Sequence, residues 1–536
     1  MTPPLAAEAQ PPAGPIAAAI AAAGRVGPYA ASDFEVTTGD GAPLTPAAKL
    51  YFAKEYIAVP KSGIPVAGVG SGMTAFDDVR GWAAGSIRAS DDARPALVWI
   101  AAPQLVAGAR LAADAKTLQV GGTTIPFALH PKLDLNRSYF DTRSAAFFAE
   151  RPLTVRGEMR GAAFVGRTLW PDDFRVDPRA PLAPLPQAPS SQAALRDLMR
   201  ATPDGGARAP FASRVIWERT GSRRGGSDQP VLVVMVNGAQ GDDDESWGGH
   251  FAIGTGVLPA SGRIDDLLIN NFYSLDVVSE KGILAAPVPL DNYLADLNSG
   301  QAWYRPSLLI IATLSDPRAA MVIQGAFNRV YPQFWRHQLV YQHATMNCAS
   351  ISVDTLRALD WHVPARGASS IPLAWLSIPY ALVKDRSVEQ ARMAYEYLTE
   401  DQTRLFPAAA FEEIGADLLR LATNGAAADD GALPRMLADD LTALITVRVP
   451  QLPSSRKYGS WPVVSPSEYY GKVPRDPAHA QIVPVPPRPF PSNLRDPDLL
   501  APPSRRSNIA LLVWGAAALV LVAFAAWRIA RRFLGS

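Results

Sequence analysis

A run of nineteen residues near the end of the chain, from Ile509 to Trp527, contains no charged residue and no proline. At about 1.5 Å rise per residue, a helix of this length spans roughly 28 Å, close to the hydrocarbon thickness of a bilayer. Trp514 and Trp527 suit the two membrane interfaces. The run is flanked by arginines at positions 505, 506, 528, 531 and 532. We therefore predict a transmembrane anchor over residues 507–532 and a soluble body before it.

The orientation of this anchor is open. Three arginines after the apolar run and two before it favour a cytoplasmic C-terminus. The first thirty residues, however, are rich in alanine and proline and have no basic residue before Arg25, unlike a secretory signal. The sequence predicts a single-pass protein of the inner or cytoplasmic membrane, and leaves the side of its soluble body undecided.

Composition limits the classes of function. Hydrophobic residues make up 48% and charged residues 19% of the 536 residues, which is typical of a globular protein. The net charge of +1 provides no field to attract nucleic acid. The single cysteine, Cys348, excludes an intramolecular disulfide and a cysteine-rich zinc site. We predict no metal, no cofactor and no nucleic-acid partner.

Proline-rich stretches divide the chain into segments. Residues 31–180 contain short apolar runs bounded by Gly, Asp and Pro, which predicts a β-rich N-terminal domain. Residues 192–385 alternate strand-like and helix-like patterns, and residues 386–450 have a helical Ala/Leu periodicity. The remaining segments are a flexible Ala/Pro tail over residues 1–30, a linker over 181–191 and a semi-rigid, proline-rich tether over 451–506.

Cys348 is the first candidate for chemistry. It stands in Asn347-Cys348-Ala349-Ser350, where an apolar helical pattern begins. The unpaired amides at a helix N-terminus lower the pKa of a thiol and favour the reactive thiolate. The alternative interpretation is a buried, inert cysteine.

His250 and two asparagines could complete a catalytic set. His250 follows two glycines and opens a strand-like segment, where its imidazole could serve as the base that a thiol nucleophile requires. Asn270 and Asn271 lie in the middle of the next strand-like segment, where asparagine is disfavoured and one of them could orient the imidazole. The alternatives are a structural histidine and a pair of turn or edge asparagines.

An acyl-transfer reaction also needs donors for an oxyanion. The backbone amide of Cys348 is one candidate, and the side chain of Gln342 or His343 is another. Asn347 is expected to support the site from its position directly before the cysteine.

The order of these motifs resembles the circularly permuted papain-like fold, and in particular the bacterial Lnb-type N-terminal domain family. The resemblance covers residues 228–362 through Gly249-His250-Phe251, Asn271-Phe272 and Tyr341 followed by Asn347-Cys348-Ala349-Ser350. It implies Cys348 as nucleophile, His250 as base and Asn271 as the orienting group. It also implies acyl-thioester chemistry, with lipid acyl transfer in one branch and amide or ester hydrolysis in the wider group.

The expected fold class is therefore α+β. A permuted papain-like domain, with an antiparallel sheet packed on the helix that bears the cysteine, would follow a β-rich domain and precede the anchor. The first functional hypothesis is a membrane-anchored thiol hydrolase or acyltransferase acting on lipid acyl or peptide substrates. The second is a non-catalytic papain-like scaffold at the membrane, with a protein partner bound by the N-terminal domain.

Overall fold

The fold was obtained as a computed structural model, and it describes part of the chain. The described residues are 20–21, 24–38, 56–62, 73–86, 94–95, 97–131, 140–222, 225, 227–241, 246–272, 277–278, 285–298, 300–335, 339–453, 457–474, 479 and 488–489. The predicted anchor at 507–532 lies outside these residues. In the ranges just given, no helix has the length and apolar character needed to cross a bilayer.

The first sheet is built from residues before position 172. Its strand order is β1 (Ile20–Ala21), β7 (Gln104–Leu111), β10 (Leu153–Arg160), β11 (Ala163–Pro171), β9 (Thr123–Leu129) and β8 (Thr117–Val120). Strand β7 also pairs with β8, so the sheet closes on itself. A separate three-stranded sheet contains β4 (Phe34–Thr38), β5 (Tyr56–Pro60) and β6 (Val98–Trp99).

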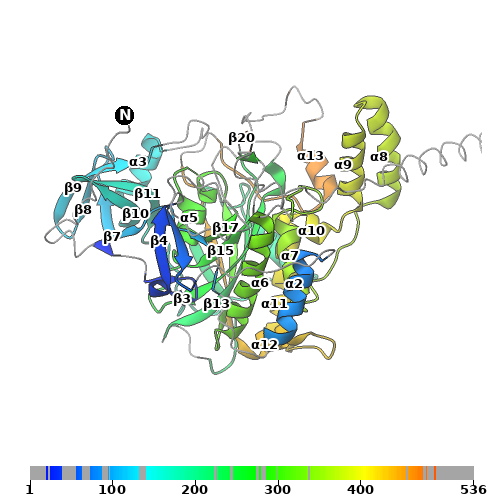
Figure 1. The fold of residues 1–536 in the computed structure, drawn as a ribbon, viewed down its shortest axis with the longest axis horizontal. Helices are drawn as coiled ribbons and strands as arrows, with labels where there is room; N and C mark the ends of the chain where they lie inside the picture. Colours follow the sequence, from blue (N-terminus) through cyan, green and yellow to red (C-terminus); the bar gives the residue numbers. More distant parts are fainter. Residues whose placement is uncertain are drawn as a thin grey trace, which may run out of the picture.

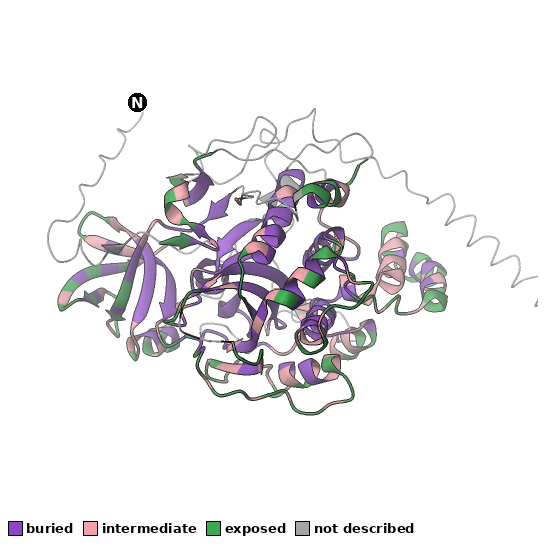
Figure 2. Cartoon of the chain, turned by 90° about the horizontal axis from the view of Figure 1, so that it is seen from below, coloured by how far each residue is buried: buried purple, intermediate pink, exposed green. Residues whose placement is uncertain are grey.

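The second large sheet forms the centre of the molecule (Figure 1). Its order is β12 (Ala212–Glu218), β19 (Leu441–Val449), β18 (Ser307–Leu314), β13 (Gln229–Asn237), β14 (His250–Leu258), β15 (Leu268–Asn271) and β17 (Ala286–Pro289). Every neighbouring pair in it is antiparallel. Strands β13 and β18 are buried along almost their whole length, as the continuous purple of the central strands in Figure 2 shows.

Helices cover one face of the seven-stranded sheet. They include α6 (Arg318–Trp335), α7 (Cys348–Ala358) and α11 (Pro407–Asn424), with α4 (Ser191–Met199) packed on α11 and α2 (Ala75–Ser86) packed on α6 and α7. The helix α2 comes from the N-terminal segment, and Arg329 of α6 binds Asp78 of α2 through two hydrogen bonds of 2.8 and 2.9 Å. The predicted mixed α+β class, with several sheets, is confirmed.

Two buried ion pairs join the first sheet to the second part of the chain. Arg156 of β10 donates to both carboxylate oxygens of Asp291, at 2.7 and 3.0 Å, and both side chains are almost fully buried. Arg167 of β11 binds Asp296 at 3.0 Å. Asp291 lies in the short helix α5 (Leu290–Ala295), which leads toward β18. The first sheet is therefore joined to α5 and the residue that follows it by charged contacts that are shielded from water.

The predicted helical extension over residues 386–450 is wrong in its last part. Residues 441–449 form β19, which lies between β12 and β18 in the sheet. Besides α11, the helices of this region are α9 (Val388–Thr399), α10 (Gln402–Leu405) and α12 (Ala432–Asp440), and α8 (Ile371–Lys384) directly precedes it. The prediction failed because β19 is buried on both faces over most of its length and so lacks the strict alternation of apolar and polar residues that identifies a strand.

The folded body extends into two segments that were predicted to lie outside it, the tether over residues 451–506 and the tail over residues 1–30. Ser460 pairs with Ala239, Val463 is buried, and α13 (Pro466–Lys472) follows, so residues 457–474 belong to the folded body. At the other end, β2 (Arg25–Val26) and β3 (Tyr29–Ala30) pair, and Val26 and Tyr29 pack on Leu268. The predicted linker at 181–191 runs beside β12, where Leu182 pairs with Val215.

Candidate functional site

Cys348 is the first residue of α7, and Asn347 caps that helix. The Oδ1 atom of Asn347 accepts hydrogen bonds from the amides of Ala349 and Ser350, at 2.8 and 3.0 Å, and the Ser350 hydroxyl accepts from the Asn347 amide. This reciprocal capping box holds the first turn rigid. The cap uses the amides of Ala349 and Ser350, so the amide of Cys348 is the first-turn donor left for another acceptor.

The Cys348 thiol is buried, with 4% of the residue exposed. Burial raises the pKa of the Cys348 thiol above its ordinary value. Hydrogen bonds from the Phe251 amide, the Tyr341 hydroxyl and the Ala349 amide, together with the positive charge of Arg305, act in the opposite direction. The prediction of a lowered pKa is therefore wrong for this arrangement. The helix N-terminus is present as expected, but desolvation is the larger effect.

His250 begins β14 and follows a glycine that no other residue could replace. Gly249 has a φ of +74°, and a Cβ atom there would lie 2.3 Å from the carbonyl oxygen of Asn237. The backbone turns sharply at this glycine, and His250 then pairs with Asn237 at the end of β13. The His250 side chain is buried, with its ring centroid 6.2 Å from that of Tyr293.

Asn271 contacts the imidazole directly. The distance from Nε2 of His250 to Oδ1 of Asn271 is 3.1 Å, and both residues are buried. The neighbouring Asn270 points to the other face of the sheet, because successive residues of a strand alternate. There it exchanges hydrogen bonds with Gln324 of α6 and donates to the Ile253 carbonyl. Of the two candidates, the structure brings Asn271 to the histidine and assigns Asn270 a packing role.

The Cys348 thiol lies at the start of β14, the strand that His250 begins. The amide that donates to the thiol belongs to Phe251, the residue that follows His250. A helix terminus, a strand terminus and the adjacent strand β15 thus bring Cys348, His250 and Asn271 to one end of the sheet. The three residues predicted as catalytic come from three separate elements. His250 lies in β14, Asn271 in β15 and Cys348 in α7.

Arg305 is a buried cation whose positive charge acts on the Cys348 thiol. It is 7% exposed and donates to the Gly238 carbonyl at 3.4 Å and to Oε1 of Gln240 at 3.2 Å. Its Nε atom has no hydrogen-bond partner among the described residues. A cation in this position favours negative charge on the sulfur or on an oxyanion nearby.

The three supporting residues differ in what they do. Asn347 is fully committed to structure, because its Nδ2 donates to the carbonyls of His343 and Leu405 while its Oδ1 caps α7. Gln342 pairs through its backbone with Met346, and its Oε1 accepts from the Thr345 hydroxyl. His343 is exposed, and its ring lies edge-on to Tyr341 at 5.4 Å. Gln342 and His343 therefore shape the loop that leads to the nucleophile.

Sequence reasoning assigned no role to Tyr341, Arg305 or Tyr293. Tyr341 bonds the thiol through its hydroxyl. Tyr293 stands beside the imidazole and donates its hydroxyl to Asn237, which in turn donates to Ser307 at 2.7 Å. Only Tyr341 lies close to the cysteine in sequence, so proximity could have suggested it. The other two reach the site through the fold.

Comparison with known proteins returned no matching family model, no curated relative and no similar solved structure.

Proposed function

We propose that this chain is a thiol hydrolase or acyltransferase that forms an acyl-thioester on Cys348. The observation that carries this proposal is the hydrogen bond between His250 and Asn271 at the start of β14. The next residue of that strand, Phe251, donates its backbone amide to the Cys348 thiol. A thiol, an imidazole and an asparagine carbonyl are the three groups that papain-like acyl transfer requires. The resemblance to the Lnb-type family, stated above on the same residues, supports the same chemistry.

The reaction begins from a neutral thiol, since burial raises the pKa of Cys348. Sγ forms a bond to the acyl carbonyl carbon while His250 takes the thiol proton through Nδ1, because Nε2 is engaged with Asn271. The amide of Cys348 donates to the developing oxyanion, and Arg305 favours its charge.

Collapse of the tetrahedral intermediate breaks the bond to the leaving oxygen or nitrogen, which takes the proton from His250. A water, hydroxyl or amine acceptor then attacks the thioester and gives its proton to His250. Release of the acyl product returns that proton to the sulfur. The cycle needs no metal and no redox partner, and its substrate would be a lipid acyl ester or a peptide amide.

Intact-protein mass spectrometry tests this proposal. The full chain is incubated with phospholipid vesicles and, separately, with an acylated peptide. We expect a mass increase of one acyl group that neutral hydroxylamine removes, and the donor that produces it identifies the substrate class. Cys348→Ser should form no such adduct, and His250→Ala should form it more slowly by about 10²- to 10⁴-fold. Wild-type protein that acquires no adduct from either donor would contradict the proposal.

A second candidate function is a non-catalytic papain-like scaffold. The burial of Cys348 and the resulting rise in its pKa are typical of an inert cysteine. Iodoacetamide labelling across pH separates the two functions. A scaffold predicts a labelling profile that His250→Ala leaves unchanged and full cellular function for Cys348→Ser, whereas an enzyme predicts that both substitutions have an effect.

A further inference from the structure

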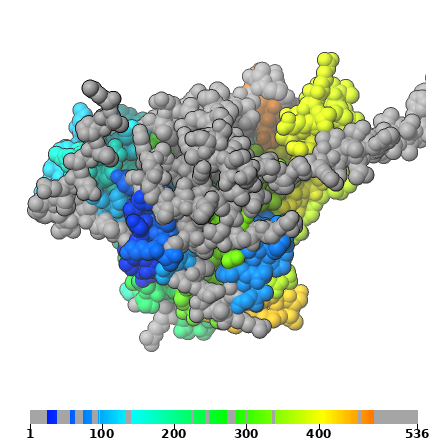
Figure 3. Space-filling model, in the orientation of Figure 1, coloured from blue at the N-terminus to red at the C-terminus, as the bar shows by residue number. Residues whose placement is uncertain are grey.

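The helices α8 and α9 form a hairpin that projects from the body, seen in yellow at the upper right of Figure 3. Of the twelve large hydrophobic residues that are exposed in the described part of the chain, seven lie between Ile371 and Val388. Isolated exposed apolar residues need no explanation, but a contiguous group on one projecting element marks a binding surface.

Four of the six exposed apolar residues of α8 lie on one helical face, and Ile371 and Leu382 lie elsewhere on the helix. Leu373, Leu376, Tyr380 and Val383 are spaced three, four and three residues apart, and Leu376 and Val383 are 65% and 81% exposed. The opposite face carries the small or apolar residues Ala374, Ile378 and Ala381, which are buried against α9. The helix therefore has one apolar face packed on its neighbour and a second apolar face without a covering element in the described structure.

The charges of α8 are confined to its end. No charged residue occurs from Ile371 to Val383, and the first cation is Lys384, followed by Asp385 and Arg386. All three of these residues are exposed. Lys384 also lies over the Tyr380 ring, with its Nζ 5.3 Å from the centroid. An apolar face of this kind can enter lipid while Lys384 keeps its ammonium, and Tyr380 its hydroxyl, at the level of the headgroups.

The size of the surface argues against a protein partner. A helix of fourteen residues is about 21 Å long and about 10 Å wide, so its outer face offers roughly 200 Å². A stable protein interface buries about 800 Å² on each partner. Insertion into lipid has no such lower limit, because each side chain that enters the acyl region contributes on its own.

The rest of the chain would keep a bilayer within reach. Thirty-four residues separate Pro474 from the predicted anchor at Ile509. Fully extended, they span at most about 120 Å. We propose that α8 inserts its outer face into the interfacial layer of the bilayer that holds the anchor.

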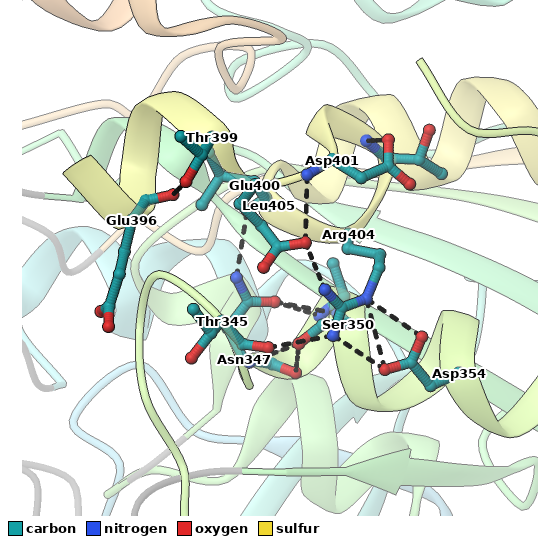
Figure 4. A network of polar contacts seen from close by, with 12 residues as sticks. Thr345, Asn347, Ser350, Asp354, Glu396, Thr399, Glu400, Asp401, Arg404 and Leu405 are labelled. Atoms are coloured by element: carbon teal, nitrogen blue, oxygen red, sulfur yellow. Dashed lines mark hydrogen bonds and ion pairs between the residues drawn. The ribbon is translucent and has the colours of Figure 1, made fainter. Parts of the chain in front are cut away.

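The hairpin is connected to the loop before Cys348 by hydrogen bonds. The two ends of the hairpin meet where Ala368 pairs with Asp401. Arg404 then connects the hairpin end to the loop, because it binds Glu400, donates twice to Asp354 of α7 and donates to the Thr345 carbonyl at 3.1 Å (Figure 4). Asn347 adds a bond to the Leu405 carbonyl at 3.1 Å. Lipid binding by the hairpin is separate from the proposed chemistry and does not require an active thiol.

Fluorescent labels placed at single cysteines test the insertion. In full-length Cys348→Ser protein, Leu376→Cys and Val383→Cys each carry an environment-sensitive dye, and both positions are exposed enough to leave the fold intact. The proteins are reconstituted in vesicles of phosphatidylethanolamine and phosphatidylglycerol, with or without lipids bearing a shallow or a deep nitroxide. Met73→Cys and Glu389→Cys provide matched exposed controls away from the outer face of α8.

We expect a blue shift at Leu376 and Val383, with stronger quenching by the shallow nitroxide, and neither effect at the two control positions. Labels at 376 and 383 that stay water-exposed in reconstituted protein would overturn the proposal. Equal quenching at all four positions would do the same. A blue shift that depends on protein density and ignores the nitroxides would identify a protein partner instead. Each outcome is independent of acyl-adduct formation, because Cys348 is absent.

Discussion

The imidazole of His250 and the side-chain amide of Asn271 are 3.1 Å apart, from Nε2 to Oδ1, in a buried environment. Because Oδ1 is an acceptor, this contact places the ring proton on Nε2 and leaves Nδ1 as the basic nitrogen. Asn271→Ala should slow acylation of Cys348 by about tenfold or more, part of the ~10²- to 10⁴-fold supplied by a positioned base. Single-turnover adduct formation, followed by mass spectrometry, measures this change.

Asn270 offers a matched control for that experiment. It has the same side chain one residue earlier, but bonds Gln324 and the Ile253 carbonyl on the other face of the sheet. Asn270→Ala should lower the free energy of unfolding by ~1–3 kcal/mol, because buried partners lose their hydrogen bonds. Acylation per folded molecule should stay at the wild-type rate. Equal kinetic losses in the two variants would show that Asn271 has no specific role.

Asn347, which caps α7, is predicted to act on stability rather than on the reaction itself. Asn347→Ala should destabilise the protein by ~1 kcal/mol or more, because two first-turn amides lose their acceptor. Asn347→Asp keeps that acceptor but loses the donors to the His343 and Leu405 carbonyls. We expect the aspartate variant to have intermediate stability in denaturant unfolding. An aspartate variant less stable than the alanine variant would contradict the assigned capping role.

The buried ion pair of Arg156 and Asp291 should contribute strongly to the free energy that holds the first sheet against α5. Removing one partner leaves a buried charge without its closest counterion, since Asp266 is 3.7 Å from Arg156, so Arg156→Met or Asp291→Leu alone should cost about 3 kcal/mol of unfolding free energy. The double variant should be less destabilised than the sum, since both charges are then absent. Urea unfolding of the four proteins gives the coupling energy. Strictly additive effects would mean that the ion pair contributes no specific linkage.

The sequence predicted the elements of the site better than their environment. The strand that begins at His250 and the start of the helix at Cys348 agree with the structure. Asn347 before a helical pattern is a local signal, and so is an apolar run between turn residues. The raised pKa of Cys348 could not be read from such signals, because it depends on how completely the fold buries the thiol and on how far that burial outweighs the opposing hydrogen bonds from Phe251 and Tyr341.

The strand β19 shows a second limit of sequence reasoning. Its residues, LTALITVRV, are consistent with a helix and with a fully buried strand, since periodicity cannot separate the two in a short apolar run. The preceding helices made a helix the simpler expectation. Residues 441–449 form a strand because they pair with β12 on one side and β18 on the other, which the sequence alone does not show.

His130 should make the stability of the first sheet sensitive to acid. Burial, followed by the charges of Arg167 and Arg160, lowers the pKa of His130 from 6.5 to about 3. Its Nε2 lies 3.1 Å from Nη1 of Arg167, which suits a neutral imidazole that accepts a hydrogen bond. The unfolded chain binds a proton near pH 6.5 and the folded protein does not. The stabilisation from His130 is therefore complete above pH 6.5 and is lost as the pH falls toward about 3.

His130→Gln keeps an acceptor for Arg167 and removes the titration. Thermal unfolding of both proteins should give Tm values that differ in their pH dependence between about pH 6.5 and 4.5, where the variant has the shallower decline. Subtracting the two curves cancels the carboxylates that titrate in the same window, because both proteins contain them. Parallel curves in this window would mean that His130 is protonated in the folded protein, which would contradict both its burial and its bond to Arg167.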